Sequence, residues 1–344
     1  MRLRIRARLA SAAGFLRLTD VALAAARLRR PPTFLTVLNY HRVTTPDEAA
    51  ELDEGVVDAT PESLDRQLWI LQRHFTLVSL SDLLSHLEGH PLPPNPALVT
   101  FDDGYRDNLY MGVPVLQRHG VRAIFFVATR YVGERRLFWW DRVSWIVKHA
   151  RRRRFSLPRP DPVEVDIDRG VSQVERRLHR IIKDRPGLDL EDFLQSLAWA
   201  SDAPWSDAVE AELVQRHVMT WDDVRALRRA GMDIGSHTRT HRVLQTVPTG
   251  ELADELAGSR SELEAQVGEP ILTVAYPVGR PVAGIPAIRA AVVDAGYRLG
   301  FSYGTGRQDL RRLDPLDVHR FSVERDTSDH AFLADLALPW LTPE

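Results

Sequence analysis

Residues 97–105 read Ala-Leu-Val-Thr-Phe-Asp-Asp-Gly-Tyr, an apolar run that ends in two adjacent carboxylates. The run is short and rich in apolar residues, so we expect a strand over Ala97–Phe101. Asp102 and Asp103 follow it directly, where a carboxylate without a partner is costly. An ordinary Asp-Asp-Gly turn is the alternative interpretation. The end of a strand favours a functional site, because active sites of parallel α/β folds lie at that edge of the sheet.

A second polar motif follows another short strand-like run. Residues 236–241 read Ser-His-Thr-Arg-Thr-His, directly after the run 232–235. Two histidines four residues apart can reach one metal ion from a helical turn. By itself this spacing also fits two surface or core histidines. One carboxylate with two imidazoles is, however, a common ligand set of a catalytic metal that keeps a position open for water. The two motifs together therefore predict a metal site.

Outward from these motifs, strand-like and helix-like runs alternate along the chain. This alternation predicts a parallel sheet that is closed or half-closed into a barrel. We expect strands over residues 34–40, 76–80, 97–101, 122–128, 232–235, 271–276, 298–303 and 318–323. We expect helices over residues 61–75, 81–87, 106–119, 220–230, 250–267 and 285–295, with Thr60, Ser81 and Thr220 as their capping residues where a cap can be read.

One region interrupts the alternation. Residues 137–217 contain the Trp139-Trp140 pair, the run Arg151–Arg154 and a proline-rich stretch, followed by helical patterns. The four arginines are more typical of a solvated helix end than of a polyanion-binding patch. We therefore predict a helical insertion over 137–217 within a barrel formed by 32–136 and 218–326. Residues 1–31 are predicted to be an N-terminal helical segment, and residues 327–344 a C-terminal helix or tail.

Composition restricts the class of protein. The 344 residues include 45 basic and 47 acidic side chains, a net charge of −2, and 44% of them are hydrophobic. These values indicate a globular protein with no general affinity for nucleic acid. The chain has no cysteine, which excludes thiolate ligands and nucleophiles. Arg17 and Asp20 interrupt the apolar N-terminal run, so we expect a cytoplasmic protein rather than a secreted one. The N-terminal segment packs on the domain in one interpretation and lies on a membrane surface in the other.

The two motifs resemble those of a known family. Thr-Phe-Asp-Asp-Gly at 100–104 and His-Thr-x-x-His at 237–241 are similar to the signatures of the polysaccharide deacetylases of carbohydrate esterase family four, the NodB homology domain. The resemblance begins at Tyr40-His41-Arg42-Val43 and ends near Val323. The N-terminal segment and the insertion fall outside it.

The resemblance implies a distorted (β/α)7 barrel, one divalent metal ion, most often zinc, and a carbohydrate substrate. Asp102 resembles the general base, while Asp103, His237 and His241 resemble the metal ligands. The implied activity is removal of N-acetyl groups from an amino sugar similar to N-acetylglucosamine, in a polysaccharide or a saccharide precursor. An esterase or amide hydrolase with another substrate is the alternative, followed by a catalytically weak glycan-binding domain.

Other positions depart from the family pattern. Residues 275–279 read Ala-Tyr-Pro-Val-Gly where Arg-Pro-Pro-Tyr-Gly is common, so the arginine that braces the catalytic aspartate is missing at Ala275. Tyr105, Tyr276 and Pro277 are the predicted substrate contacts. The late Leu-His signature of the general acid is not evident. We expect His41, which ends the first strand, to fill that role, with His319 as the second candidate.

Overall fold

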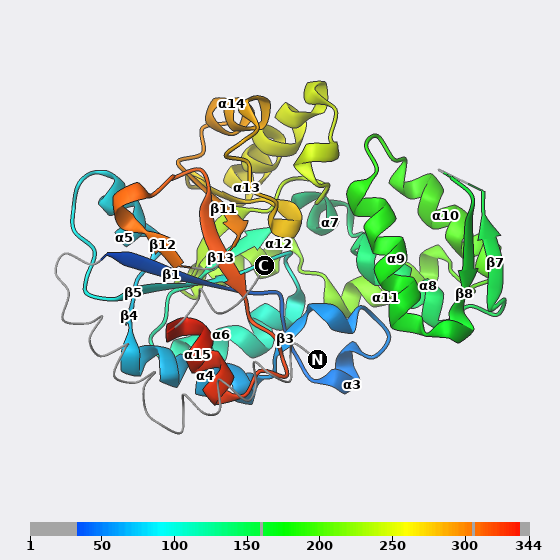
Figure 1. The fold of residues 1–344 in the computed structure, drawn as a ribbon, viewed down its shortest axis with the longest axis horizontal. Coiled ribbons are helices and arrows are strands. Elements are labelled where there is room, and N and C mark those ends of the chain that lie inside the picture. Colours follow the sequence, from blue (N-terminus) through cyan, green and yellow to red (C-terminus); the bar gives the residue numbers. More distant parts are fainter. Residues whose placement is uncertain (1–32, 159–160, 305–306, 338–344) are drawn as a thin grey trace.

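A computed structural model describes residues 33–158, 161–304 and 307–337. Its centre is a barrel of parallel strands (Figure 1). In order around the barrel the strands are β1 (Phe34–Tyr40), β13 (Val318–Ser322), β11 (Leu299–Tyr303), β10 (Thr273–Ala275), β9 (Asp233–Ser236), β6 (Ile124–Val127) and β5 (Pro96–Phe101). The barrel closes because β5 also pairs with β1, from Thr36 opposite Ala97 to Tyr40 opposite Phe101. The predicted (β/α)7 barrel is confirmed.

Two short strands extend the sheet beyond the closed barrel. β4 (Thr76–Leu77) pairs with the start of β5, and β12 (Arg307–Asp309) runs antiparallel to the start of β1. A separate small sheet joins β2 (Arg42–Val43) to β3 (Val57–Ala59). β2, β3 and β12 were not predicted, because runs of two or three residues show no periodicity.

Helices cover the outside of the barrel, and local capping chemistry sets where several of them begin. In α4 (Pro61–His74), the Thr60 hydroxyl accepts from the Ser63 amide and the Ser63 hydroxyl accepts from the Thr60 amide. Thr220 and Asp223 form the predicted capping box of α12 (Trp221–Arg229). The remaining outer helices are α3 (Pro46–Ala49), α5 (Leu80–Leu87), α6 (Val113–Arg118), α7 (Thr129–Glu134), α13 (Ser259–Val267), α14 (Pro286–Asp294) and α15 (Asp329–Ala337).

The structure corrects the predicted start of α5. We expected a strand over 76–80 and a cap at Ser81, whereas the strand ends at Leu77 and Ser79 caps the helix. The Ser79 hydroxyl accepts from the Asp82 amide, and the Asp82 carboxylate accepts from the Ser79 amide. The capping box two residues earlier satisfies two amide groups that a cap at Ser81 would leave without partners.

Residues 139–217 lie to one side of the barrel, in green in Figure 1. They form α8 (Trp139–Lys148), α9 (Val171–Asp184), α10 (Leu190–Ser201) and α11 (Asp207–His217), together with a hairpin of β7 (Arg154–Leu157) and β8 (Val163–Asp166). The hairpin was missed, since proline-rich sequence argued against strands. Exposed and buried residues alternate along β7, the pattern of a strand with one buried face.

Alternate strand residues divide the core in two. One set faces the interior of the barrel and includes Val37, Leu98, Phe126, Phe301 and Val318. Their immediate neighbours in sequence pack outward against the helices, as part of the larger cluster. Because strand side chains point alternately to the two faces, the position two residues after each inward residue also faces inward.

Two expected regions are only partly described. The N-terminal segment 1–31, with its proposed membrane contact, lies outside the described residues. Of the C-terminal region, α15 is described and packs against α4, while residues 338–344 are outside the description. No helix among the described residues is both long enough and apolar enough to cross a bilayer.

We predict that Gly235→Ala destabilises the barrel. A Cβ at Gly235 in β9 would lie 2.5 Å from two ring carbons of Phe126 and 2.9 Å from the Thr273 methyl carbon. Overpacking of this kind costs about 1–3 kcal/mol. The free energy of unfolding from urea titration measures it. Gly250→Ala is the matched control, because a Cβ there meets nothing within 4 Å. Equal stability of the two variants would contradict the close packing of β9.

Candidate active site

The C-terminal end of the barrel interior is polar. Asn39, Thr100, Tyr303 and Arg320 each lie two residues after an inward apolar residue of their strand, and so they continue the inward-facing rows. They are joined by hydrogen bonds: Arg320 donates to the Asn39 side-chain oxygen at 2.6 Å, and Asn39 donates to the Tyr303 hydroxyl at 2.8 Å. The last layer of the barrel is therefore a polar floor beneath the strand ends.

Asp102 lies on this floor, clamped by a buried arginine. Arg320 donates to both carboxylate oxygens at 2.8 Å, and the Asn39 amide donates at 3.0 Å. Both ion-pair partners are almost fully inaccessible to solvent. Burial is the largest effect on Asp102 and alone would raise its pKa, but the charge and hydrogen bonds of Arg320, together with the nearby His237 and His41, outweigh burial and lower the pKa below its usual value. Arg320 on β13 thus braces Asp102. The resemblance had led us to look for this arginine at position 275, which is occupied by Ala275.

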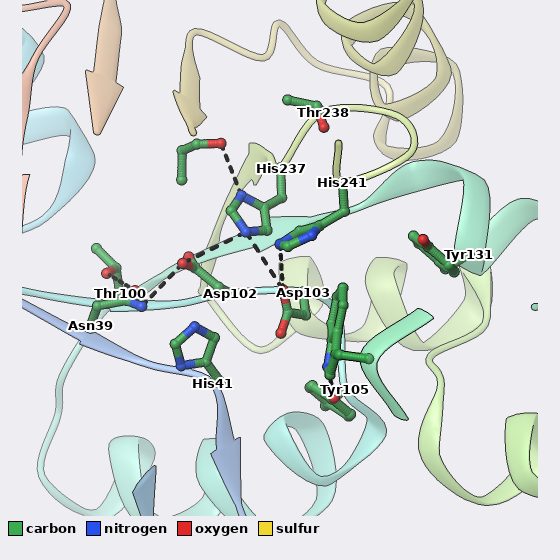
Figure 2. A network of polar contacts seen from close by, with 12 residues as sticks. Asn39, His41, Thr100, Asp102, Asp103, Tyr105, Tyr131, His237, Thr238 and His241 are labelled. Atoms are coloured by element: carbon green, nitrogen blue, oxygen red, sulfur yellow. Dashed lines mark hydrogen bonds and ion pairs between the residues drawn. The ribbon is translucent and has the colours of Figure 1, made fainter. Parts of the chain in front are cut away.

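Asp103 faces the two histidines (Figure 2). Its Oδ1 lies 3.5 Å from His237 Nε2 and 3.4 Å from His241 Nε2, and one ligand atom from each residue lies within 4.8 Å of the others. All three side chains are buried. Asp103 Oδ1 has no hydrogen-bond partner within the described structure. A buried, unpartnered carboxylate oxygen beside two imidazole nitrogens fits a divalent cation.

The protonation of this trio also fits a cation. Burial, together with the negative charges of Asp102 and other nearby acids, outweighs the positive charge of His41 and raises the pKa of Asp103 to about 8. The positive charge around this carboxylate is therefore too small to keep it ionised at neutral pH. Burial lowers the pKa of His237 to about 4 and that of His241 well below its usual value, which leaves both imidazoles neutral. His237 Nδ1 lies 2.9 Å from the Ala275 carbonyl, a contact that places the proton on Nδ1 and the lone pair on Nε2.

The loop that carries the histidines is held in an unusual conformation. Thr238 and His241 have φ values of 61° and 55°, in the left-handed region that non-glycine residues rarely adopt, and Asp103 has φ 76°. The buried carboxylate of Glu255 accepts from the Arg239 and Thr240 amides at 3.1 and 2.9 Å and from the Thr240 hydroxyl. Strain that the surrounding structure maintains in this way is common at functional sites.

His41 approaches the carboxylates from the side opposite the two histidines (Figure 2). Its Nδ1 lies 2.8 Å from Asp58 Oδ2, which also accepts from the His41 amide, and its Nε2 lies 3.1 Å from the Tyr303 hydroxyl. Burial lowers the pKa of His41, but the negative charges of Asp58, Asp103 and Asp102 outweigh burial and raise it to about 9. His41 is therefore protonated at neutral pH in the metal-free chain.

These residues surround one cavity of about 200 Å³. From the barrel it is lined by His41, Asp102, Asp103, His237, His241, Val278 and Tyr303, and from the β2–β3 connection by Asp53, Gly55 and Val56. The insertion supplies Trp139, Trp140, His179 and Lys183. The insertion thus forms one wall of the cavity, as its place after a barrel strand predicts.

The three predicted substrate contacts are not among the described residues that line the cavity. Tyr105 is buried, where its hydroxyl donates to Asp141 at 2.7 Å and accepts from the Trp140 indole at 2.6 Å. Trp140 in turn packs on His241, with ring centroids 4.4 Å apart. Tyr276 is buried with its hydroxyl on the Leu316 carbonyl, and Pro277 is buried beside it. A strand-end position identifies the edge of the site but not where a side chain points.

Several residues of the site were not predicted. Arg320 carried a readable signal, because an arginine on the inward face of an apolar strand requires an acidic partner. Asn39 and Tyr303 share that inward register. Asp58 had no such signal, since the pairing with His41 depends on the β2–β3 sheet. His319, the second candidate for the acid, does not line the cavity described above.

Comparison with known proteins places this geometry in a family. The sequence profile described as Polysaccharide deacetylase matches residues 89–155 and 201–300. No curated protein matches the chain. Among solved structures, the Streptococcus pyogenes deacetylase PplD in complex with acetate matches with a TM-score of 0.57 at 16% identity, over 88% of this chain and 98% of that one.

Two further structures are similar to the same extent. IcaB from Ammonifex degensii has a TM-score of 0.55 at 19% identity, covering 89% of this chain and 97% of its own. A de-N-acetylase from Aggregatibacter actinomycetemcomitans has a TM-score of 0.53 at 15% identity, covering 88% and 99%. At these identities the likeness is one of fold, and the matched profile adds the sequence signature to it. The chain belongs to the polysaccharide deacetylase family.

Proposed function

We propose that this protein is a metal-dependent deacetylase that removes N-acetyl groups from an amino sugar similar to N-acetylglucosamine. The observation that carries the proposal is the unpartnered Asp103 oxygen beside two neutral imidazoles, with a second carboxylate, Asp102, at the next position. Asp103, His237 and His241 would hold the cation, for which zinc suits the mixed nitrogen and oxygen ligands. When bound, a divalent cation polarises a carbonyl oxygen and acidifies water.

Asp102 is suited to accept the proton of the attacking water. Its carboxylate stays ionised because Arg320 holds both oxygens, and the same contacts keep it from rotating. Both effects suit Asp102 to act as a general base, because the carboxylate is ionised and already held in position. The lowered pKa makes Asp102 a weak base, so it can act only on a water that is itself more acidic than bulk water.

His41 is suited to protonate the leaving nitrogen of the sugar. An amide anion is a very poor leaving group, so the nitrogen must gain a proton as the C–N bond breaks. His41 donates through Nδ1 to Asp58, which leaves the Nε2 proton, now beside the Tyr303 hydroxyl, for transfer into the cavity. In this assignment Asp102 acts as the base and His41 as the acid.

The alternatives differ in substrate rather than in the site. An esterase or another amide hydrolase would use the same three ligands and the same base. A glycan-binding domain without catalysis would not require an ionised Asp102, held by Arg320, next to the three proposed metal ligands. Acetate release from a panel of N-acetylated oligosaccharides by the zinc-loaded protein separates these functions, and no release from any of them would contradict the proposal.

We predict that Asp102→Asn lowers turnover about 10²–10⁴-fold, the usual contribution of a general base, because an amide cannot accept the water proton. Acetate release measures turnover, and the bound metal is quantified by mass spectrometry in the same samples. Metal content should be unchanged. Asp222→Asn, the same chemical change at an 87% exposed side chain, is the control. Near-normal turnover of Asp102→Asn would assign the base elsewhere.

We predict that Asp103→Asn and His241→Gln each abolish tight binding of zinc. Each removes one of three converging ligands, and two remaining ligands hold the ion far more weakly. Isothermal titration with zinc measures binding. His90→Gln, at an exposed position remote from the trio, should bind as the unmodified chain does. Unchanged affinity in either ligand variant would show that the ion binds elsewhere.

We predict that Asp58→Asn moves the alkaline limb of the kcat–pH profile to lower pH. His41 must be protonated to donate, so kcat falls as pH rises through its pKa. Burial lowers that pKa, and the Asp58 charge is the largest of the effects that raise it. Removing the charge therefore lowers the pKa. A profile unchanged in Asp58→Asn, together with normal turnover in His41→Gln, would exclude His41 as the acid.

A further inference from the structure

Part of the cavity wall that the insertion provides, the part that comes from α9, lies outside the matched family profile. The matched profile breaks between residues 155 and 201, and this gap contains all of α9. Two side chains of α9, His179 and Lys183, nevertheless line the same cavity as Asp102 and Asp103. Two residues outside the matched profile therefore face the proposed reaction site.

Lys183 carries a charge that the protein does not neutralise by contact. The structure gives its ammonium neither a hydrogen bond nor an ion pair with the described residues, and Nζ lies over the Trp139 ring, 6.0 Å from the centroid. By contrast Lys148, the other lysine of the chain, donates to two carbonyls and to Glu54. An ammonium that is partly removed from water without a partner is costly. Burial accordingly lowers the pKa of Lys183.

The three carboxylates whose charges act on Lys183 are engaged elsewhere, and one of them, Asp184, pairs with Arg280. Asp53 accepts from the Gly55 amide at 2.9 Å and lies 3.7 Å from His179 Nδ1. Asp103 faces His237 and His241, where the proposed metal ion would use its charge. None of these three acids forms an ion pair with Lys183, so an anion in direct contact with the ammonium would come from outside the described chain.

The surface next to Lys183 also carries positive charge. A smaller hollow of about 20 Å³ adjoins the cavity and shares Trp139, Lys183 and His241 with it. Arg185 and Arg242 also line this hollow, and no carboxylate is among the described residues that do so. Arg185 pairs with Asp161 and Arg242 with Glu251, both at 2.6 Å, which leaves Lys183 as the cation of this group without a partner among the described residues.

We propose that Lys183 selects substrates with an anionic group next to the N-acetylated sugar, the group lying in the larger cavity beside Lys183, where the smaller hollow adjoins it. This inference rests on the proposed function and deepens it, because it names the class of saccharide. A uronic acid carboxylate and a sugar phosphate both supply the required charge. An ammonium binds either as a point charge without demanding a planar, bidentate partner.

The test compares three probes: an oligosaccharide of alternating glucuronic acid and N-acetylglucosamine, N-acetylglucosamine 1-phosphate, and neutral tri-N-acetylchitotriose. Binding to the zinc-loaded Asp102→Asn protein is measured by calorimetry, and acetate release by the zinc-loaded enzyme with intact Asp102 is measured in parallel. We expect at least one anionic probe to bind about tenfold or more tightly than the neutral one, the size of one charge-assisted contact. Whichever anionic probe shows the preference identifies the source of the charge.

Lys183→Met is added to the same proteins. In binding it should bring the ratio of the affinities for the anionic and neutral probes close to one, and in turnover it should act mainly by raising KM for the anionic probe. Lys183→Arg should retain most of the preference. Arg180→Met, one turn earlier on α9 and exposed, removes the same charge outside the cavity and should keep the full preference. Melting temperatures establish that each variant is folded.

The outcomes separate the two proposals. Equal affinity of the three probes for the protein with Lys183 intact, or an anion preference that survives Lys183→Met, overturns the role of Lys183. A fall in kcat of the same size on every probe also overturns it, since that result indicates a proton donor. If no probe releases acetate but the Lys183-dependent preference persists in binding, the deacetylase proposal fails and the anion site stands.

Discussion

Asp102 and Asp103 place two adjacent negative charges at the buried end of β5, and the structure compensates them in different ways. Asp102 receives a full counter-charge from Arg320, which reaches it from within the barrel. Asp103 has no such ion pair: the imidazoles of His237 and His241 are neutral, and burial outweighs the charge of His41 and raises the pKa of Asp103. A buried ion pair costs desolvation that only good geometry recovers, and a lone buried carboxylate costs more. Because the charge of Asp103 is only partly compensated within the chain, the site suits a bound cation.

Closure of the barrel makes the first compensation possible. β13 and β5 do not pair with each other, but both pair with β1, so the interior brings Arg320 and Asp102 together. Asn39 on β1 connects them, because its amide donates to Asp102 while its oxygen accepts from Arg320. In an open sheet the inward face of these strands would be solvated and the guanidinium would have no reason to point at one carboxylate. The polar floor is thus a consequence of strand register in a closed barrel.

The family scaffold and the insertion contribute different chemistry to the same cavity. The barrel supplies the trio, the braced base and the His41–Asp58 pair. The insertion supplies aromatic and cationic groups and supports the ligands from outside, since Trp140 packs on His241 and is held by the Tyr105–Asp141 hydrogen bond. Barrel enzymes commonly carry their catalytic groups on rigid strand ends and form the rest of the site from variable loops. The loops after strands can change without disturbing the core.

The amino-acid sequence by itself determined the barrel, the positions of most strands and helices, and the two motifs that meet at the site. These features follow from short-range rules, namely periodicity, capping and the ends of apolar runs. It also pointed to His41, since a histidine at a strand end lies at the functional edge.

Only the tertiary structure decided that Arg320 braces Asp102, that Asp58 pairs with His41 and that Lys183 enters the cavity. It also decided that Tyr105 and Tyr276 turn away from the cavity into the core. Each of these depends on which residues distant in sequence lie face to face, and that is set by strand register and by how the insertion docks, neither of which local sequence encodes.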